Sequence, residues 1–96
     1  MIVARFMQCL NHSKIQVGDK GMKNEYKPYY EKFGLNVVYY RKRKRLTQMR
    51  LAELVDIDRS HISAIELGNV GVSFDVVFRM CEVLEITPKE LFDFRD

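Results

Sequence analysis

The sequence is poor in the residues that build disulfide frameworks, metal sites and membrane spans. Among its 96 residues it has two cysteines, two histidines, two prolines and no tryptophan. Two cysteines cannot form a disulfide framework. The two histidines lie far apart in the sequence with no HxxxH or CxxC motif near either, so we expect no metal site. No apolar run approaches the roughly 18 residues that a membrane span requires. The low cysteine content fits a reducing compartment, and we expect a cytoplasmic protein.

The sequence also lacks the motifs that common catalytic mechanisms require. No serine or cysteine stands at a recognisable spacing from a histidine, and no glycine-rich phosphate loop is present. We therefore expect no enzyme activity and no cofactor. The composition, 47% hydrophobic and 30% charged, is that of an ordinary folded domain. A chain of this length holds one hydrophobic core, so we expect no separate domain for a small-molecule ligand.

What the sequence does have is an uneven distribution of charge. The formal net charge is +3. Residues 22–50 carry nine basic and two acidic side chains, whereas residues 51–96 carry four basic and ten acidic ones. A basic segment of this kind favours nucleic acid as a partner. Attraction between the oppositely charged parts within the fold explains the pattern equally well, so charge alone leaves both interpretations open.

Helix start and stop signals recur from Pro28 onward and predict an all-α domain. Pro28 suits the first turn of a long helix, and the basic run at residues 41–45 suits the end of that helix. We predict a compact five-helix domain over residues 28–96, with its last helix reaching Phe92 or Phe94. The four further helix starts are each marked by a residue that caps helices well: Thr47, Asp58, Ser73 and Thr87.

Residues 1–27 are assigned to an N-terminal extension and linker. The sequence GDKG at residues 18–21 indicates a turn or linker. An alternative function depends on this extension: a protein-interaction module, such as an antitoxin or accessory subunit, that docks a protein partner through an apolar face. The residues of that face have the spacing of one side of a helix: Ile2, Val3, Phe6, Met7 and Leu10.

The stretch from residue 46 to residue 68, LTQMRLAELVDIDRSHISAIELG, predicts two short helices separated by a tight turn. This arrangement is typical of a helix-turn-helix. The second helix is short enough for its N-terminal end to enter the major groove of DNA, which admits one helix. Helical phase turns Ile62 and Ile65 inward. The outward positions are Arg59, Ser60, Ser63, Ala64 and Leu67.

These features resemble the lambda-repressor-like (Cro/XRE-type) helix-turn-helix regulators over roughly Leu35 to Phe92. The resemblance implies five packed helices, sequence-specific binding of double-stranded DNA, usually as a homodimer, and no enzyme activity. We accordingly expect a transcriptional regulator that acts as a repressor. The motifs that carry the resemblance are LTQ at 46–48, LAELV at 51–55, ISAIELG at 62–68 and TPKELF at 87–92.

Helical phase and the resemblance together assign roles to individual residues. The expected base-reading residues are Arg59, Ser60, Ser63 and Ala64. The residues expected to contact DNA phosphates are Gln48 and His61, together with Arg43, Lys44 and Arg45 of the basic run. Arg41 and Glu66 match a pair that forms a partly buried salt bridge in some relatives. In relatives the C-terminal helix region often pairs across a two-fold axis, and here it offers Leu91, Phe92 and Phe94 for a dimer interface.

Three turn positions depart from the pattern of this family. Arg45, Asp56 and Glu85 stand where relatives usually or often have glycine. Aspartate adopts the left-handed conformation more readily than most residues, whereas arginine does so less readily.

Ala64, on the expected recognition helix, also departs from the family pattern. It is shorter than the usual polar residue that reads a base, so it can touch a thymine methyl group but cannot hydrogen-bond a base. These departures bear on the target sequence more than on the fold.

Overall fold

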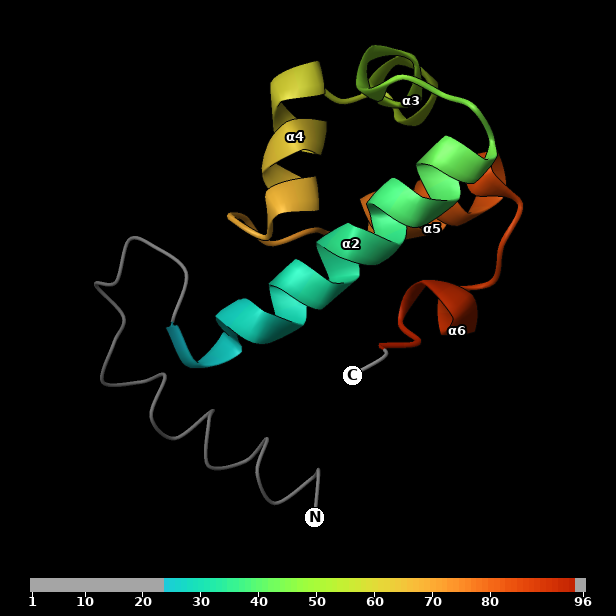
Figure 1. Cartoon of the computed structure of the whole chain (residues 1–96). Helices are drawn as coiled ribbons and strands as arrows, with labels where there is room; N and C mark the ends of the chain where they lie inside the picture. The colour runs from blue at the N-terminus through green and yellow to red at the C-terminus, as the bar shows by residue number, and fades with distance from the viewer. Residues whose placement is uncertain (1–23, 95–96) are drawn as a thin grey trace.

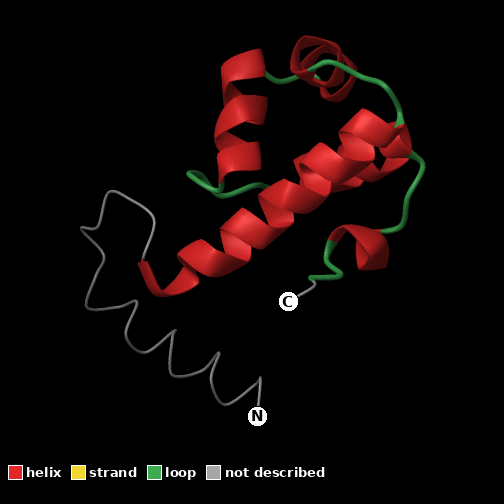
Figure 2. Ribbon diagram, viewed as in Figure 1, coloured by secondary structure: helices red, strands yellow, loops and turns green. Residues whose placement is uncertain are grey.

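The computed structural model describes residues 24–94, and within that range it contains helices and no strand. Figure 1 shows the long helix α2 crossing the molecule, with α3 and α4 on one side of it and α5 behind it. Short loops connect the helices (Figure 2). The elements are η2 (Asn24–Tyr26), α2 (Lys27–Arg43), α3 (Gln48–Val55), α4 (Arg59–Leu67), α5 (Phe74–Leu84) and α6 (Pro88–Leu91).

The predicted all-α domain with five helices is therefore confirmed. The short turn η2 precedes the boundary that the sequence suggested at residue 28, and it leads directly into α2. The apolar face expected between Ile2 and Leu10 and the turn expected at residues 18–21 lie outside the described residues.

The helices begin where the sequence predicts caps. The side-chain oxygens of Thr47, Ser73 and Thr87 each accept a hydrogen bond from the backbone N–H three residues later. Thr87 and Glu90 form a complete capping box. Asp58 occupies the fourth predicted N-cap position, but its side chain makes no capping hydrogen bond. The sequence signals are local, and they place the helix starts correctly.

The last helix is shorter than the sequence predicts. It ends at Leu91, before Phe92 and Phe94. The side-chain amide of Asn36 on α2 donates hydrogen bonds to the carbonyl oxygens of Leu91 (2.8 Å) and Asp93 (3.2 Å), which hold the chain against α2 as it leaves the helix. The side chain of Leu91 is 0% exposed. Leu91, which the sequence assigned to a dimer interface, therefore fills the core of its own domain and leaves Phe92 and Phe94 as the accessible residues of that set.

One hydrophobic core joins the helices. The predicted inner residues of α4, Ile62 and Ile65, are fully buried. Burial, with a smaller contribution from the nearby Glu90 carboxylate, raises the pKa of the Cys81 thiol, so this cysteine stays protonated as a packing residue. The buried apolar residues come from all five α-helices: Phe33, Val37, Leu51, Ala52, Val55, Ile62, Ile65, Val76, Val77, Met80, Cys81, Leu84 and Leu91.

The three turn positions without glycine keep the left-handed backbone. Arg45, Asp56 and Glu85 have φ angles of 60°, 62° and 58°. Asp56 and Glu85 are the C-caps of α3 and α5, and Arg45 lies in the turn after α2. A residue with a Cβ atom is strained by about 1–2 kcal/mol in this conformation. The fold therefore fixes these turns even where the residue does not favour them.

Gly34 lets α2 and α4 approach each other closely. A Cβ atom at this position would lie 2.4 Å from the backbone oxygen of Glu66 and 2.5 Å from that of Ile65. Both obstacles are backbone atoms of α4, so they cannot move aside without displacing the helix. The position of α4 against α2 therefore depends on the missing side chain of Gly34.

We predict that Gly34→Ala destabilises the domain by about 1–3 kcal/mol, the usual cost of overpacking, although alanine is the better helix former. Gly71→Ala is the matched control, because a Cβ atom there would meet only the Tyr30 ring, at 3.8 Å. The control should change stability by less than about 0.5 kcal/mol. Urea denaturation followed by circular dichroism measures both changes. Equal stability of the two variants would contradict a role for Gly34 in placing α4.

Candidate nucleic-acid interface

Helices α3 and α4 form a helix-turn-helix whose second helix has an uncovered outer face. α4 packs against α2 and α3 through its inner side. Arg59 and Ser60, at the N-terminal end of α4, are exposed, as predicted from helical phase, and His61 beside them is exposed as well. Ser63 and Ala64, one turn further on, are half-buried. The end of α4 that the sequence assigned to base reading is therefore accessible.

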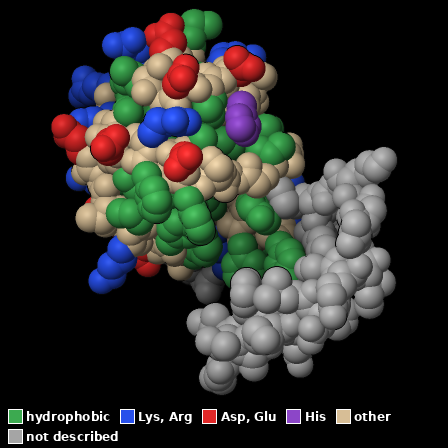
Figure 3. Space-filling model, turned by 180° about the vertical axis from the view of Figure 1, so that it is seen from behind, with side chains coloured by type: hydrophobic (Ala, Val, Ile, Leu, Met, Phe, Trp, Pro, Cys, Tyr) green, Lys and Arg blue, Asp and Glu red, His purple; other side chains and the backbone are tan. Residues whose placement is uncertain are grey.

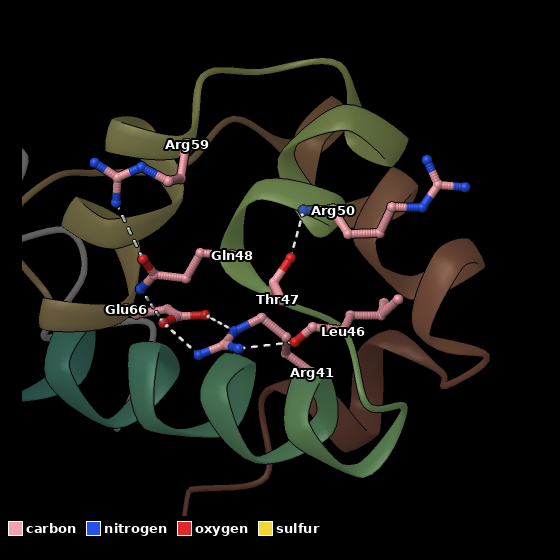
Figure 4. A network of polar contacts seen from close by, with 7 residues as sticks. All are labelled: Arg41, Leu46, Thr47, Gln48, Arg50, Arg59 and Glu66. Atoms are coloured by element: carbon pink, nitrogen blue, oxygen red, sulfur yellow. Dashed lines mark hydrogen bonds and ion pairs between the residues drawn. The ribbon is translucent and has the colours of Figure 1, made fainter.

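A buried carboxylate fixes α4 to the rest of the fold. Glu66, on the inner side of α4, is only 7% exposed. It accepts hydrogen bonds from Arg41 Nε (2.6 Å), Arg41 Nη2 (3.2 Å) and Gln48 Nε2 (2.8 Å). Arg41 also donates from Nη1 to the carbonyl oxygen of Leu46 (2.8 Å), in the turn before α3. The ion pair expected between Arg41 and Glu66 is present, and it joins three helices at one point (Figure 4).

The network continues from Glu66 to the exposed end of α4. Gln48 Oε1 accepts a hydrogen bond from Arg59 Nη1, at 3.3 Å. In Figure 4, Gln48 lies between Arg59 and Glu66, whereas the Arg50 side chain points away on the other side of α3. The structure thus brings together four residues that the sequence singled out separately: Arg41, Gln48, Arg59 and Glu66.

The three basic residues expected to contact phosphates have different surroundings. Arg43 is exposed, and its guanidinium lies 5.9 Å from the centre of the Tyr40 ring. Arg45 is exposed in its left-handed turn. Lys44 forms an ion pair with Glu85 (2.8 Å), and this hydrogen bond lowers the pKa of the Glu85 carboxyl. Lys44 is therefore the least suited of the three to contact a phosphate, because its ammonium already has a carboxylate partner.

A contact missed by the sequence reasoning supports the other end of α4. Lys27, at the start of α2, donates from Nζ to the carbonyl oxygen of Gly68 (2.7 Å) and also hydrogen-bonds the Asn69 side chain. A cation at this position interacts well with the carbonyl end of a helix. Nothing in the sequence pairs residues 41 positions apart, so only the fold reveals this support.

Other kinds of site find little support in the part of the chain that the structure describes. Over residues 24–94, no group of three or more histidine, cysteine, aspartate or glutamate side chains is arranged to hold a metal ion. None of the helices in this range is both long and apolar enough to span a membrane.

Comparisons with known proteins agree with this geometry. A family model described as "Helix-turn-helix" matches residues 38–91. Over 63 residues the chain is 38% identical to "Control protein C.BamHI" of Bacillus amyloliquefaciens, a match that covers 65% of this chain and 78% of that protein.

Two solved structures are also similar. The restriction-modification controller protein C.AhdI from Aeromonas hydrophila has a TM-score of 0.64 and 36% identity, and the match covers 66% of this chain and 96% of that one. SinR, a master regulator for biofilm formation solved in complex with DNA, has a TM-score of 0.59 and 27% identity. That match covers 64% of this chain and 98% of the solved SinR chain.

The fold and the exposed end of α4 define a protein of the lambda-repressor-like, DNA-binding class. The chain belongs to the helix-turn-helix family of transcription regulators, because the family model covers more than half of it. The resemblance inferred from the four sequence motifs is thereby confirmed.

We predict that Arg41→Ala or Glu66→Ala alone destabilises the domain by about 3–5 kcal/mol, because each leaves a buried charge without its partner. The Arg41 and Glu66 side chains are 11% and 5% exposed. Arg50 and Glu53, each 58% exposed and 3.0 Å apart, are the matched control pair. Double-mutant cycles from urea denaturation should give a large coupling for the buried pair and at most about 0.5 kcal/mol for the exposed one. A coupling near zero for the buried pair would contradict its structural role.

Proposed function

We propose that this protein is a sequence-specific regulator that binds double-stranded DNA by inserting the N-terminal end of α4 into the major groove. One observation carries the proposal: this end of α4 is exposed while Glu66 holds its inner side through Arg41 and Gln48. A helix held in this way reaches the DNA in a fixed orientation, which hydrogen-bond readout of base edges requires.

Arg59 is the best-placed base reader. Its guanidinium has five N–H donors, of which Gln48 engages one, so it can still make a bidentate contact with guanine. Gln48 likewise keeps one amide N–H beyond the one that Glu66 accepts, and this donor can reach a phosphate. Ser60, Ser63 and Ala64 complete the reading face.

We predict that Arg59→Ala weakens binding to the best site by about 1–3 kcal/mol and relaxes the preference at one base pair. Lys89→Ala is the control, because it removes the same charge from α6, away from the α3–α4 pair in Figure 1. It should leave the base preference unchanged. Selection from a random duplex pool, followed by binding titrations at several salt concentrations, measures both effects.

Binding of the unmodified protein should weaken steeply with salt, because phosphate contacts release counterions. An affinity that does not depend on salt would contradict DNA binding. An equal loss on selected and random DNA in Arg59→Ala would contradict its role as a base reader.

We further propose that the protein binds DNA as a homodimer through its C-terminal end. One helix-turn-helix covers a half-site, and a two-fold dimer places two recognition helices about 34 Å apart, one turn of DNA. Because Leu91 is buried, the residues proposed for the dimer contact are Phe92, which is 45% exposed, and the half-buried Phe94. Their rings already lie side by side, with centroids 6.0 Å apart.

We predict that Phe92→Ser shifts the protein from dimer to monomer in sedimentation at micromolar concentration. Met49→Ser, on α3, removes a similarly exposed apolar side chain (58%) and should leave the assembly unchanged. A monomer in the unmodified protein, together with a non-palindromic selected site, would contradict the proposed dimer.

The similarity to the restriction-modification controller protein C.AhdI supports a finer proposal, control of restriction-modification genes. As a repressor, the bound dimer would cover its site and block the promoter. A reporter driven by the DNA upstream of its own gene tests this: expression should fall when the protein is supplied and recover with Arg59→Ala. A rise in expression would instead make the protein an activator.

A further inference from the structure

An aromatic groove lies away from the proposed DNA-binding face. It has a volume of about 440 Å³ and runs between the start of α2, the start of α5 and the C-terminal end. Figure 3 shows hydrophobic side chains gathered on the side of the molecule seen from behind. The groove is lined, without any charged residue, by Tyr26, Tyr29, Tyr30, Phe33, Val72, Phe74, Val77, Phe92 and Phe94.

Two of the aromatic side chains that line the groove are unusually exposed. Tyr29 is 50% exposed and Phe74 is 72% exposed, although both are large aromatic side chains. The Phe33 and Phe92 rings already lie 5.2 Å apart, so the floor of the groove is preformed. A contiguous apolar surface of this kind marks a binding site for another apolar element.

The chain itself offers an occupant. Tyr26, which lines the groove, lies close to the point where residues 1–23 join the described structure. A segment tethered this closely has an effective concentration on the millimolar scale. A second copy of the protein at micromolar concentration is then at about a thousandfold disadvantage for the same groove.

The chemistry of the N-terminal segment matches the groove. Residues 1–10 carry a single charge, at Arg5, and place apolar side chains at one-turn spacing. We propose that the apolar residues between Ile2 and Leu10 bind in the aromatic groove of the same chain. The tether between Leu10 and Tyr26 can span up to roughly 50 Å, so its length does not limit the contact.

This contact has a consequence for assembly. Phe92 and Phe94 belong both to the groove and to the dimer contact proposed above. The N-terminal segment and a second copy therefore compete for these rings, so the segment weakens the proposed dimer instead of contributing to it. The inference itself rests on the groove and on the sequence of the segment, and it does not require DNA binding.

Cys9 provides a native probe for the experiment, because Cys81 is buried and reacts slowly. A nitroxide attached to Cys9 of the full chain should broaden the NMR signals of Tyr29, Phe74 and Phe92. Signals of Met49 and Leu54 on α3 should be unaffected. Equal broadening of the groove and α3 signals, or none at either, would overturn the proposal.

Two variants and one mixed sample complete the test. Phe6→Asp, in the segment, and Phe74→Ser, at a groove residue too exposed to be needed for folding, should each abolish the broadening. Arg5→Gln, the neighbouring control, should retain it. Broadening only between chains, seen when labelled protein is mixed with isotope-enriched unlabelled protein, would assign the groove to a second copy and overturn the proposal. DNA binding is measured separately, so its failure would leave this result intact.

Discussion

The fold depends on one buried carboxylate. Glu66 gathers Arg41 from α2 and Gln48 from α3 around α4, and Arg41 extends the same contact to the turn at Leu46. A buried charge is tolerated only when its lone pairs are satisfied, and Glu66 accepts three hydrogen bonds. Because the donors come from α2 and α3 and the carboxylate from α4, the requirement to satisfy one carboxylate also fixes the relative positions of three helices. Gln48 connects this site to the exposed end of α4, because it hydrogen-bonds both Glu66 and Arg59.

The local features of the fold could be predicted from the sequence. Caps act over three residues and amphipathic spacing acts within one helix, so Thr47, Ser73 and Thr87 mark helix starts without knowledge of the tertiary structure. The inward positions Ile62 and Ile65 follow from periodicity for the same reason. Periodicity does not predict the ion pair of Arg41 with Glu66, because the two residues lie 25 positions apart; only the resemblance to a family links them.

Contacts between distant residues could not be predicted. At the end of α6, the Asn36 amide donates a hydrogen bond to the Leu91 carbonyl, 55 positions away, and the Leu91 side chain is buried in the core. The spacing of apolar residues places Leu91 on an apolar face. It does not tell whether the core of the same domain or a second copy covers that face. In the candidate site, helical phase identified the outward residues of α4, whereas the bond from Arg59 to Gln48 and the partner of Lys44 required the packed structure.

The left-handed turns at Arg45, Asp56 and Glu85 bear on the lifetime of the protein in the cell. Backbone strain of about 1–2 kcal/mol at each of these residues lowers the stability of the folded state, and glycine there would relieve the strain but lose about 0.5–1 kcal/mol more in conformational entropy. Proteases remove unfolded chains, so a lower stability lowers the steady-state abundance. A DNA-binding regulator of lower stability is then cleared sooner after its synthesis stops, and the occupancy of its site falls with its concentration. Backbone strain in three turns thus becomes a factor in how quickly a gene can be reset.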